Sequence, residues 1–226
     1  MTRCILAALT VAALTPLTAQ ERRDFTPFLI ADRGAEIALA RTAAPRAVSD
    51  SATILVMTRE GLVEAVRGSN GFACFVLRSF SSGLADTAFW NPRLRAPHCL
   101  NAPAVQTVLP EIRKRVEWVL AGVPLPEIAA RTRRGYASGE FPLPAPGAMA
   151  YMLSPKQYLV DEDPHWMPHL MFYYDAAMRP STWGAGDFSS PVINGSASVP
   201  DDPVLTLFIP VPQWSDGTPA PRHAGQ

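Results

Sequence analysis

The segment TILVMTREGLVEAVRGSNGFACFVLR, residues 53–78, contains the strongest fold signal of this chain. Three runs in it, 53–58, 62–67 and 72–78, are rich in β-branched and aromatic residues and are bounded by turn residues, a pattern typical of strands. The links between them are short, and Asn70-Gly71 tolerates the positive φ of a hairpin turn. The segment therefore predicts three strands in a β-meander.

Elements on both sides of this meander define the predicted fold class. A short helix is expected at residues 31–42, and apolar residues three and four positions apart predict two helices after the meander. The first contains Val105, Val108, Ile112, Val116 and Val119, and the second Leu125, Ile128, Ala129, Thr132 and Tyr136. Strands are expected again at residues 148–153, 170–174 and 204–211. The order strands, helices, strands predicts an α+β domain with a mostly antiparallel sheet.

The N-terminus resembles a secretory signal peptide. Arg3 precedes an uncharged apolar stretch, Pro16 interrupts it and the small residue Ala19 follows, which is the three-part pattern of such signals. We expect cleavage near Ala19 and a secreted or periplasmic mature protein without a transmembrane segment, although an uncleaved anchor is an alternative. Residues 20–215 are then expected to form a single domain, followed by a flexible tail at residues 216–226.

Charge and motifs exclude several functional classes. The chain has 20 basic and 20 acidic residues and 23 prolines, with no long run of like charge, which argues against nucleic acid as a partner. It contains no nucleophile elbow, zinc-protease motif, P-loop or C-x-x-C motif. The expected partner is an unknown small molecule or an envelope protein.

Two cysteines, Cys74 and Cys99, remain once Cys4 is removed with the signal. An even number of cysteines in an oxidising compartment predicts a disulfide between them. Two buried free thiols are the alternative.

The segment 161–169 has the densest cluster of chemically active residues, with three carboxylates and two imidazoles. His165, His169 and Asp163 are therefore candidate ligands for a divalent metal, although no other cofactor is expected. Pro164 and Pro168 prevent a helix that would place both histidines on one face. The alternative is that the histidines hydrogen-bond to backbone carbonyls in a proline-constrained loop.

Two further segments contain candidate binding residues. Trp90, Arg93 and Arg95 lie in an aromatic and arginine-bearing loop, residues 89–99, and two arginines are able to hold a carboxylate or phosphate. Trp183 precedes glycines that would admit a ligand close to the backbone. Salt bridges that pin the loop, and an ordinary turn, are the alternative interpretations.

These residues support two functional hypotheses. The first is a non-catalytic binding or interaction module whose pocket is built from loop 89–99 and the aromatic C-terminal strands. The second is a hydrolase-like or metal-dependent enzyme that uses His165 or His169 with Asp161, Asp163 or Asp187. Catalytic residues are not otherwise identifiable from the sequence.

The chain resembles a family of secreted bacterial proteins that has no established activity. The resemblance rests on residues 31–33, 36–40, 68–72, 89–92, 146–149, 165–173, 183–184 and 214–217, of which HWMPHLMFY at 165–173 is distinctive. It implies export and a single domain, and it implies no ligand or catalytic residue.

Overall fold

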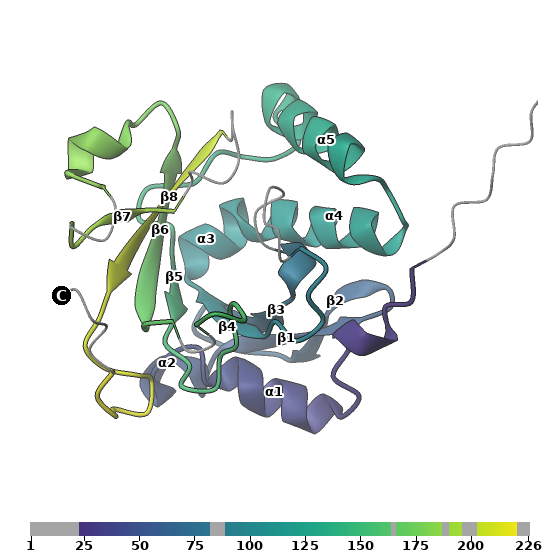
Figure 1. Ribbon diagram of the computed structural model, residues 1–226, viewed down its shortest axis with the longest axis vertical. Helices are drawn as coiled ribbons and strands as arrows, with labels where there is room; N and C mark the ends of the chain where they lie inside the picture. The colour runs from purple at the N-terminus through teal and green to yellow at the C-terminus, as the bar shows by residue number, and fades with distance from the viewer. Residues whose placement is uncertain (1–22, 82–88, 164–165, 187–189, 196–202, 221–226) are drawn as a thin grey trace, which may run out of the picture.

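The computed structural model describes residues 23–81, 89–163, 166–186, 190–195 and 203–220. In these ranges eight strands form one sheet in the order β2-β1-β3-β4-β5-β6-β8-β7 (Figure 1). The strands are β1 (Thr53–Thr58), β2 (Gly61–Val66), β3 (Ala73–Leu77), β4 (Ala96–Leu100), β5 (Met149–Met152), β6 (His169–Asp175), β7 (Ile193–Asn194) and β8 (Val204–Pro210). All neighbours are antiparallel except β1 and β3, so the expected α+β class is confirmed.

The helices follow local sequence signals. They are α1 (Arg33–Arg41), α2 (Arg46–Ser49), α3 (Ala102–Thr107), α4 (Leu109–Leu120) and α5 (Leu125–Ser138), with short 3-10 turns η1 (Thr26–Phe28), η2 (Ser79–Ser81) and η3 (Pro180–Trp183). The Asp32 side chain begins α1 by accepting from Gly34 N at 2.7 Å, because the first amides of a helix lack intrahelical partners. Gly139, at φ 78°, ends α5 in the left-handed conformation that glycine adopts without a steric penalty.

Helix α1 covers one face of the sheet through small residues. Ala40 on α1 and the following Ala43 and Ala44 pack against Ile54 and the Cys74–Cys99 pair. These two cysteines face each other across β3 and β4 and are joined by a disulfide. The disulfide predicted from the sequence is therefore present beneath α1.

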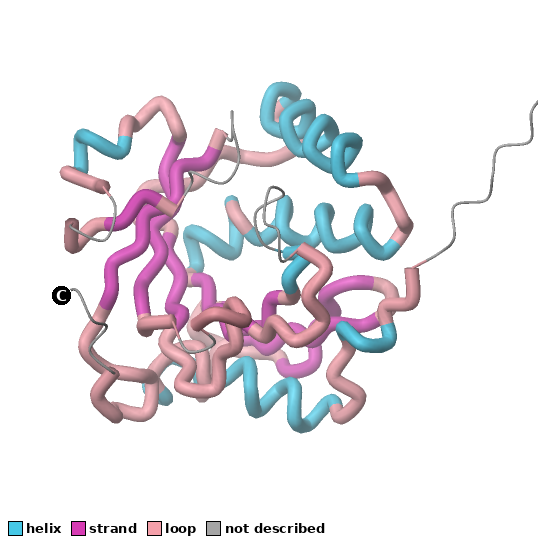
Figure 2. The backbone as a smooth tube through the Cα atoms, in the orientation of Figure 1, coloured by secondary structure: helices cyan, strands magenta, loops and turns pink. Residues whose placement is uncertain are grey.

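Helices α3, α4 and α5 lie on the opposite face of the sheet (Figure 1). Ile112 and Val116 of α4 and Ile128 of α5 share a core cluster with Phe75 of β3 and Leu100 of β4. Strands β5, β6 and β8 run at a steep angle to β1, β2 and β3 (Figure 2), as expected from the twist accumulated over many strands. The sheet therefore curves around the space on the side of α4.

The three N-terminal strands do not form the expected meander. Strands β1 and β2 form a hairpin, but β3 pairs with the other side of β1, parallel to it, through Thr53↔Ala73 and Ile54↔Cys74. The chain crosses over the start of β1 at Gly68, where an added Cβ would lie 2.1 Å from Thr53 N. Residues 68–71 are thus a crossover and not a hairpin turn. The crossover requires glycine at position 68 because a side chain there would clash with the start of β1.

Two other elements differ from the sequence-based prediction. Residues 96–100, expected to lie in a loop, form the fully buried strand β4 between β3 and β5. Its pairing with β5 covers Cys99 and Leu100 and not Pro97, because proline has no amide hydrogen to donate to a neighbouring strand. The first central helix is divided at Val108 into α3 and α4, with Pro110 in the first turn of α4.

The two ends of the chain bear on the predicted domain limits. Residues 1–22, which include the proposed signal peptide, and residues 221–226 lie outside the described ranges. Residues 216–220 were expected to belong to a flexible tail. In the structure they complete a turn in which Trp214 N donates to Thr218 O at 2.9 Å. In the described ranges no helix has the length and apolar character that crossing a membrane requires.

Candidate functional site

A cavity of about 510 Å³ lies between the concave face of the sheet and helices α4 and α5. Its volume falls within the range of roughly 300–1,000 Å³ that is typical of small-molecule sites. Most of the residues that line it are apolar, among them Leu77, Ala96, Ile112, Met152, Met171 and Phe208. The cavity is also lined by three half-buried residues, Leu159, Trp166 and Val204.

Strand alternation determines which side chains face the cavity. Ala96 and His98 of β4 line it, as do His169, Met171 and Tyr173 of β6, because side chains two residues apart share a face of a strand. These residues come from one sheet, whereas the far wall of the cavity comes from α4 and α5.

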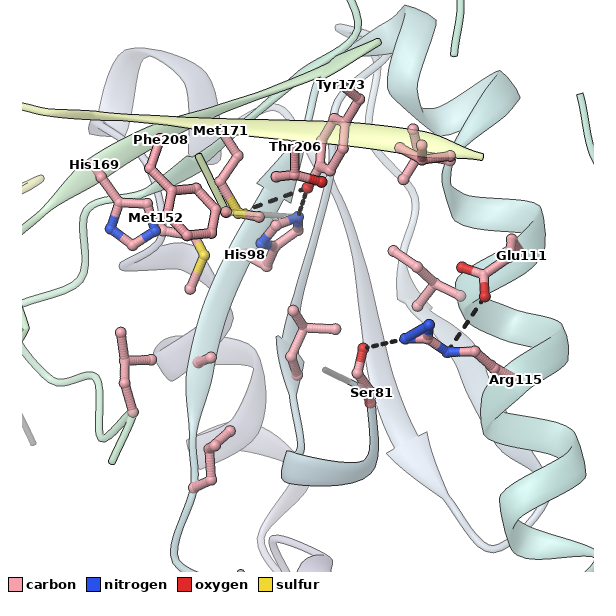
Figure 3. A pocket seen from close by; sticks show the side chains of 18 of the residues that line it. Ser81, His98, Glu111, Arg115, Met152, His169, Met171, Tyr173, Thr206 and Phe208 are labelled. Atoms are coloured by element: carbon pink, nitrogen blue, oxygen red, sulfur yellow. Dashed lines mark hydrogen bonds and ion pairs between the residues drawn. The ribbon is translucent and has the colours of Figure 1, made fainter. Parts of the chain in front are cut away.

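The polar centre of the cavity is a bond between His98 and Tyr173. Tyr173 Oη lies 2.9 Å from His98 Nε2, and both residues are buried (Figure 3). The Tyr173 hydroxyl also approaches Met171 Sδ at 3.7 Å. The other nitrogen of the imidazole, His98 Nδ1, is buried and has no hydrogen-bond partner in the described part of the chain.

Both imidazoles in the cavity are neutral at pH 7. Burial, with a smaller contribution from His169 when that imidazole is protonated, lowers the pKa of His98 to about 3. Burial also lowers the pKa of His169 to about 4, although its bond to Met167 opposes the shift. Burial raises the pKa of Tyr173, so its phenol is neutral as well.

His169 is fixed by the backbone and by aromatic rings. Its Nδ1 lies 2.9 Å from Met167 O, and since a carbonyl only accepts, Nδ1 carries the hydrogen. The rings of Trp166 and Phe208 flank it at centroid distances of 4.6 and 5.1 Å. His169 therefore hydrogen-bonds to a backbone carbonyl, which was the alternative to metal binding in the sequence analysis. It also lines the cavity.

An ion pair occupies the α4 side of the cavity. Arg115 Nε lies 3.3 Å from Glu111 Oε1, one helical turn away, and Arg115 Nη2 donates to Ser81 O at 3.1 Å (Figure 3). Both side chains are about nine-tenths buried. The pair carries no net charge, so it adds polarity to this wall without attracting an ion.

The residues singled out in loop 89–99 hold the loop in place and do not line the cavity. Trp90 packs against Phe28 and Phe89. Arg93 lies over the Tyr158 ring and 3.6 Å from Asp161 Oδ1. Arg95 donates to Pro92 O and Leu94 O at 2.7 Å, and burial lowers its pKa to about 10.

Trp183 also lies away from the cavity. It is 42% exposed, stacks on Tyr174 with ring centroids 4.9 Å apart and donates its Nε1 hydrogen to Met178 Sδ. These contacts place it in a surface cluster at the end of η3.

The predicted metal ligands are not gathered within the described ranges. There, no three His, Cys, Asp or Glu side chains lie close enough to hold a metal ion together. His165 and Asp187 lie outside these ranges, and Asp161 is bound to Tyr158 and Asn91 at the surface. Metal binding through His165, His169 and Asp163 therefore stays a prediction.

Sequence reasoning missed the residues at the polar centre, His98 and Tyr173. Pro92 and Pro97 made residues 90–99 resemble a loop, so His98 was not assigned to a strand face. Alternation in the run Ala96-Pro97-His98-Cys99-Leu100 would have placed His98 on the face opposite Cys99. Tyr173 was assigned to a strand, but its partner is 75 residues away.

Comparisons of the chain with protein-family models, curated proteins and solved structures found no match. The resemblance to a secreted bacterial family is therefore a prediction that rests on the quoted motifs alone.

Proposed function

We propose that this protein is an exported binding module that takes a small, mainly apolar molecule into the cavity between the sheet and helices α4 and α5. The observation that carries the proposal is the cavity itself, which combines a mostly apolar lining with a few polar groups at fixed positions. This composition is typical of small-molecule sites, in which apolar contacts supply affinity and polar groups fix orientation.

The state of the histidines favours binding over catalysis. His98 and His169 both have pKa values lowered by burial, to about 3 and 4. A general base is most effective when its pKa lies near the working pH. Among the described residues, His98 is hydrogen-bonded to the Tyr173 phenol and His169 to the Met167 backbone carbonyl. Neither of these partners is a carboxylate that would assist proton transfer.

Export is part of the same proposal. The signal-like residues 1–19 and the Cys74–Cys99 disulfide support it, since disulfides persist mainly in oxidising compartments.

Probe binding to cavity-filling variants tests the proposal. A neutral apolar fluorophore such as phenylnaphthylamine is titrated into the wild type, Met171→Trp and the control Leu170→Trp. Met171 lines the cavity, whereas its neighbour Leu170 is absent from the lining and belongs to the opposite face of β6. We expect Met171→Trp to weaken binding at least tenfold and Leu170→Trp to leave it within about twofold. Equal affinities for the two variants would contradict the proposal.

A further inference from the structure

Two buried polar atoms of the cavity lining, His98 Nδ1 and Thr132 Oγ1, have no hydrogen-bond partner among the described residues. His98 is 1% exposed, and its Nδ1 has no hydrogen-bond partner among the described residues. Most buried side-chain polar atoms are hydrogen-bonded, so an unpaired one calls for an explanation. His98 lines the cavity, so a bound molecule that displaces the side chains covering this atom would supply its missing partner.

We propose that the ligand of this cavity is a neutral, hydroxyl-bearing apolar molecule whose hydroxyl group hydrogen-bonds to His98 Nδ1, an inference that rests on the proposed function.

The position of His98 places this hydrogen bond inside the apolar part of the cavity. His98 lies one residue beyond the Cys99–Tyr151 pair of β4 and β5, which brings it level with Met152, and Met152 in turn pairs with His169 of β6. Figure 3 shows the His98 ring between Tyr173 and the group of Met152, His169 and Phe208. Nε2 is hydrogen-bonded to Tyr173. The unpaired Nδ1 therefore lies on the side of the imidazole ring that points away from Tyr173.

The hydrogen bond between His98 and Tyr173 can form with either residue as the donor, and these two arrangements indicate that the ligand group at Nδ1 is a hydroxyl. If Tyr173 donates to Nε2, the neutral imidazole carries its hydrogen on Nδ1 and donates to the ligand. If Nε2 donates to Tyr173 Oη, the phenol hydrogen turns to Met171 Sδ, 3.7 Å away, and Nδ1 accepts from the ligand. A hydroxyl group both donates and accepts, so it satisfies Nδ1 in either arrangement, whereas a carbonyl fits only the first.

The charges around the cavity identify the ligand as neutral. The imidazoles of His98 and His169 are uncharged at pH 7 because burial lowers both pKa values. Glu111 and Arg115 neutralise each other at 3.3 Å. An ionised ligand would lose its hydration without gaining a counter-ion of its own, which is strongly unfavourable.

Naphthalene, naphthol and naphthoate form a matched series for the test, because they share one ring system and differ only in the polar group. Affinities are measured at pH 7 by ring fluorescence with the wild type and with His98→Leu combined with Tyr173→Phe. We expect wild type to bind naphthol about tenfold more tightly than naphthalene, as one added hydrogen bond implies, and to bind naphthoate least. In His98→Leu combined with Tyr173→Phe, which removes the phenol that His98→Leu alone would leave unpaired in the cavity, the preference for naphthol over naphthalene should disappear while naphthalene still binds.

The outcomes separate this inference from the proposed function. Equal affinities for naphthol and naphthalene in the wild type, or tightest binding of naphthoate, would overturn the inference and leave the binding function standing. Binding of none of the three would remove both.

A second measurement covers the case in which this double variant does not fold. In the wild type, the ¹⁵N resonance of His98 Nδ1 should move on addition of naphthol and not on addition of naphthalene. An unchanged Nδ1 resonance in the presence of saturating naphthol would overturn the inference.

Discussion

Tyr173 reaches His98 across an intervening strand, and Ala150 lies beneath the bond. β5 separates β4 from β6, and in the register of these three strands Leu100, Ala150 and Met171 form one row. His98 lies in β4, two residues to one side of this row. Tyr173 lies in β6, two residues to the opposite side of it. Ala150 thus lies at the midpoint between them, and its small side chain leaves room for the 2.9 Å bond.

Breaking this bond should destabilise the fold. Tyr173→Phe leaves both nitrogens of buried His98 without a partner among the described residues, and an unsatisfied buried group costs about 1–3 kcal/mol. In a double-mutant cycle, Tyr173→Phe combined with His98→Leu should cost at least about 1 kcal/mol less than the sum of the single variants. Urea unfolding measures these free energies. Tyr174→Phe, on the opposite face of β6, is the control and should change the free energy of unfolding by about 0.5 kcal/mol or less; strict additivity of the pair would contradict the coupling.

Acidification should destabilise the protein through its two neutral imidazoles. The folded-state pKa values of His98 and His169 are about 3 and about 4, below the value of about 6.5 for an unfolded chain. Between these limits the unfolded state binds more protons, so stability is full above pH 6.5 and declines as pH falls, by up to about 1.4 kcal/mol per pH unit for each histidine. Denaturant midpoints measured from pH 7 to pH 4 should fall less steeply for His98→Leu than for the wild type, since carboxylates contribute equally to both. Parallel profiles would contradict this assignment.

The disulfide should stabilise the fold without affecting the cavity. Cys74 and Cys99 are 25 residues apart in sequence, and closing such a loop stabilises a protein by about 3 kcal/mol on the chain-entropy model. Both residues belong to the cluster beneath α1, whereas the cavity lies on the other face. The variant Cys74→Ala with Cys99→Ala should therefore unfold at a lower urea concentration and still bind phenylnaphthylamine within about twofold of wild type. Loss of probe binding by the folded variant would show that the two faces are coupled.

The buried ion pair Arg78–Glu36 should matter far more than the exposed pair Arg93–Asp161. Arg78 Nη2 lies 2.7 Å from Glu36 Oε1 and neither side chain is more than 1% exposed. Arg78→Met leaves a buried carboxylate without its counter-ion, which costs about 3–5 kcal/mol. Arg93→Met, in the matched exposed pair, should cost about 1 kcal/mol or less. Similar losses for the two variants in urea unfolding would be inconsistent with this difference in burial.

The fold class could be predicted from sequence because its signals are local. The runs that form β1, β5, β6 and β8 and the apolar spacing of α5 each depend on neighbouring residues alone. The parallel placement of β3 could not be predicted in the same way, because it depends on a contact between Gly68 and the start of β1, 15 residues earlier.

The candidate site was predictable only in part for a similar reason. His169 was selected because it lies in a conspicuous local cluster, and it does line the cavity. His98 follows Pro92 and Pro97, which suppress the strand signal, and its role depends on Tyr173 and on the curvature of the whole sheet. Trp90, Arg93 and Arg95 were equally conspicuous, yet their partners are the loop itself and its immediate neighbours.

Methyl NMR of the methionines tests the central claim, that the cavity binds small apolar molecules, most directly. Met152 and Met171 line the cavity, whereas Met57 is buried elsewhere in the core and Met178 is exposed beside Trp183. On titration of ¹³C-methyl-labelled protein with naphthalene, the account predicts saturable shifts at Met152 and Met171 and little change at Met57 and Met178. Shifts at Met178 alone, or at no methionine, would contradict it.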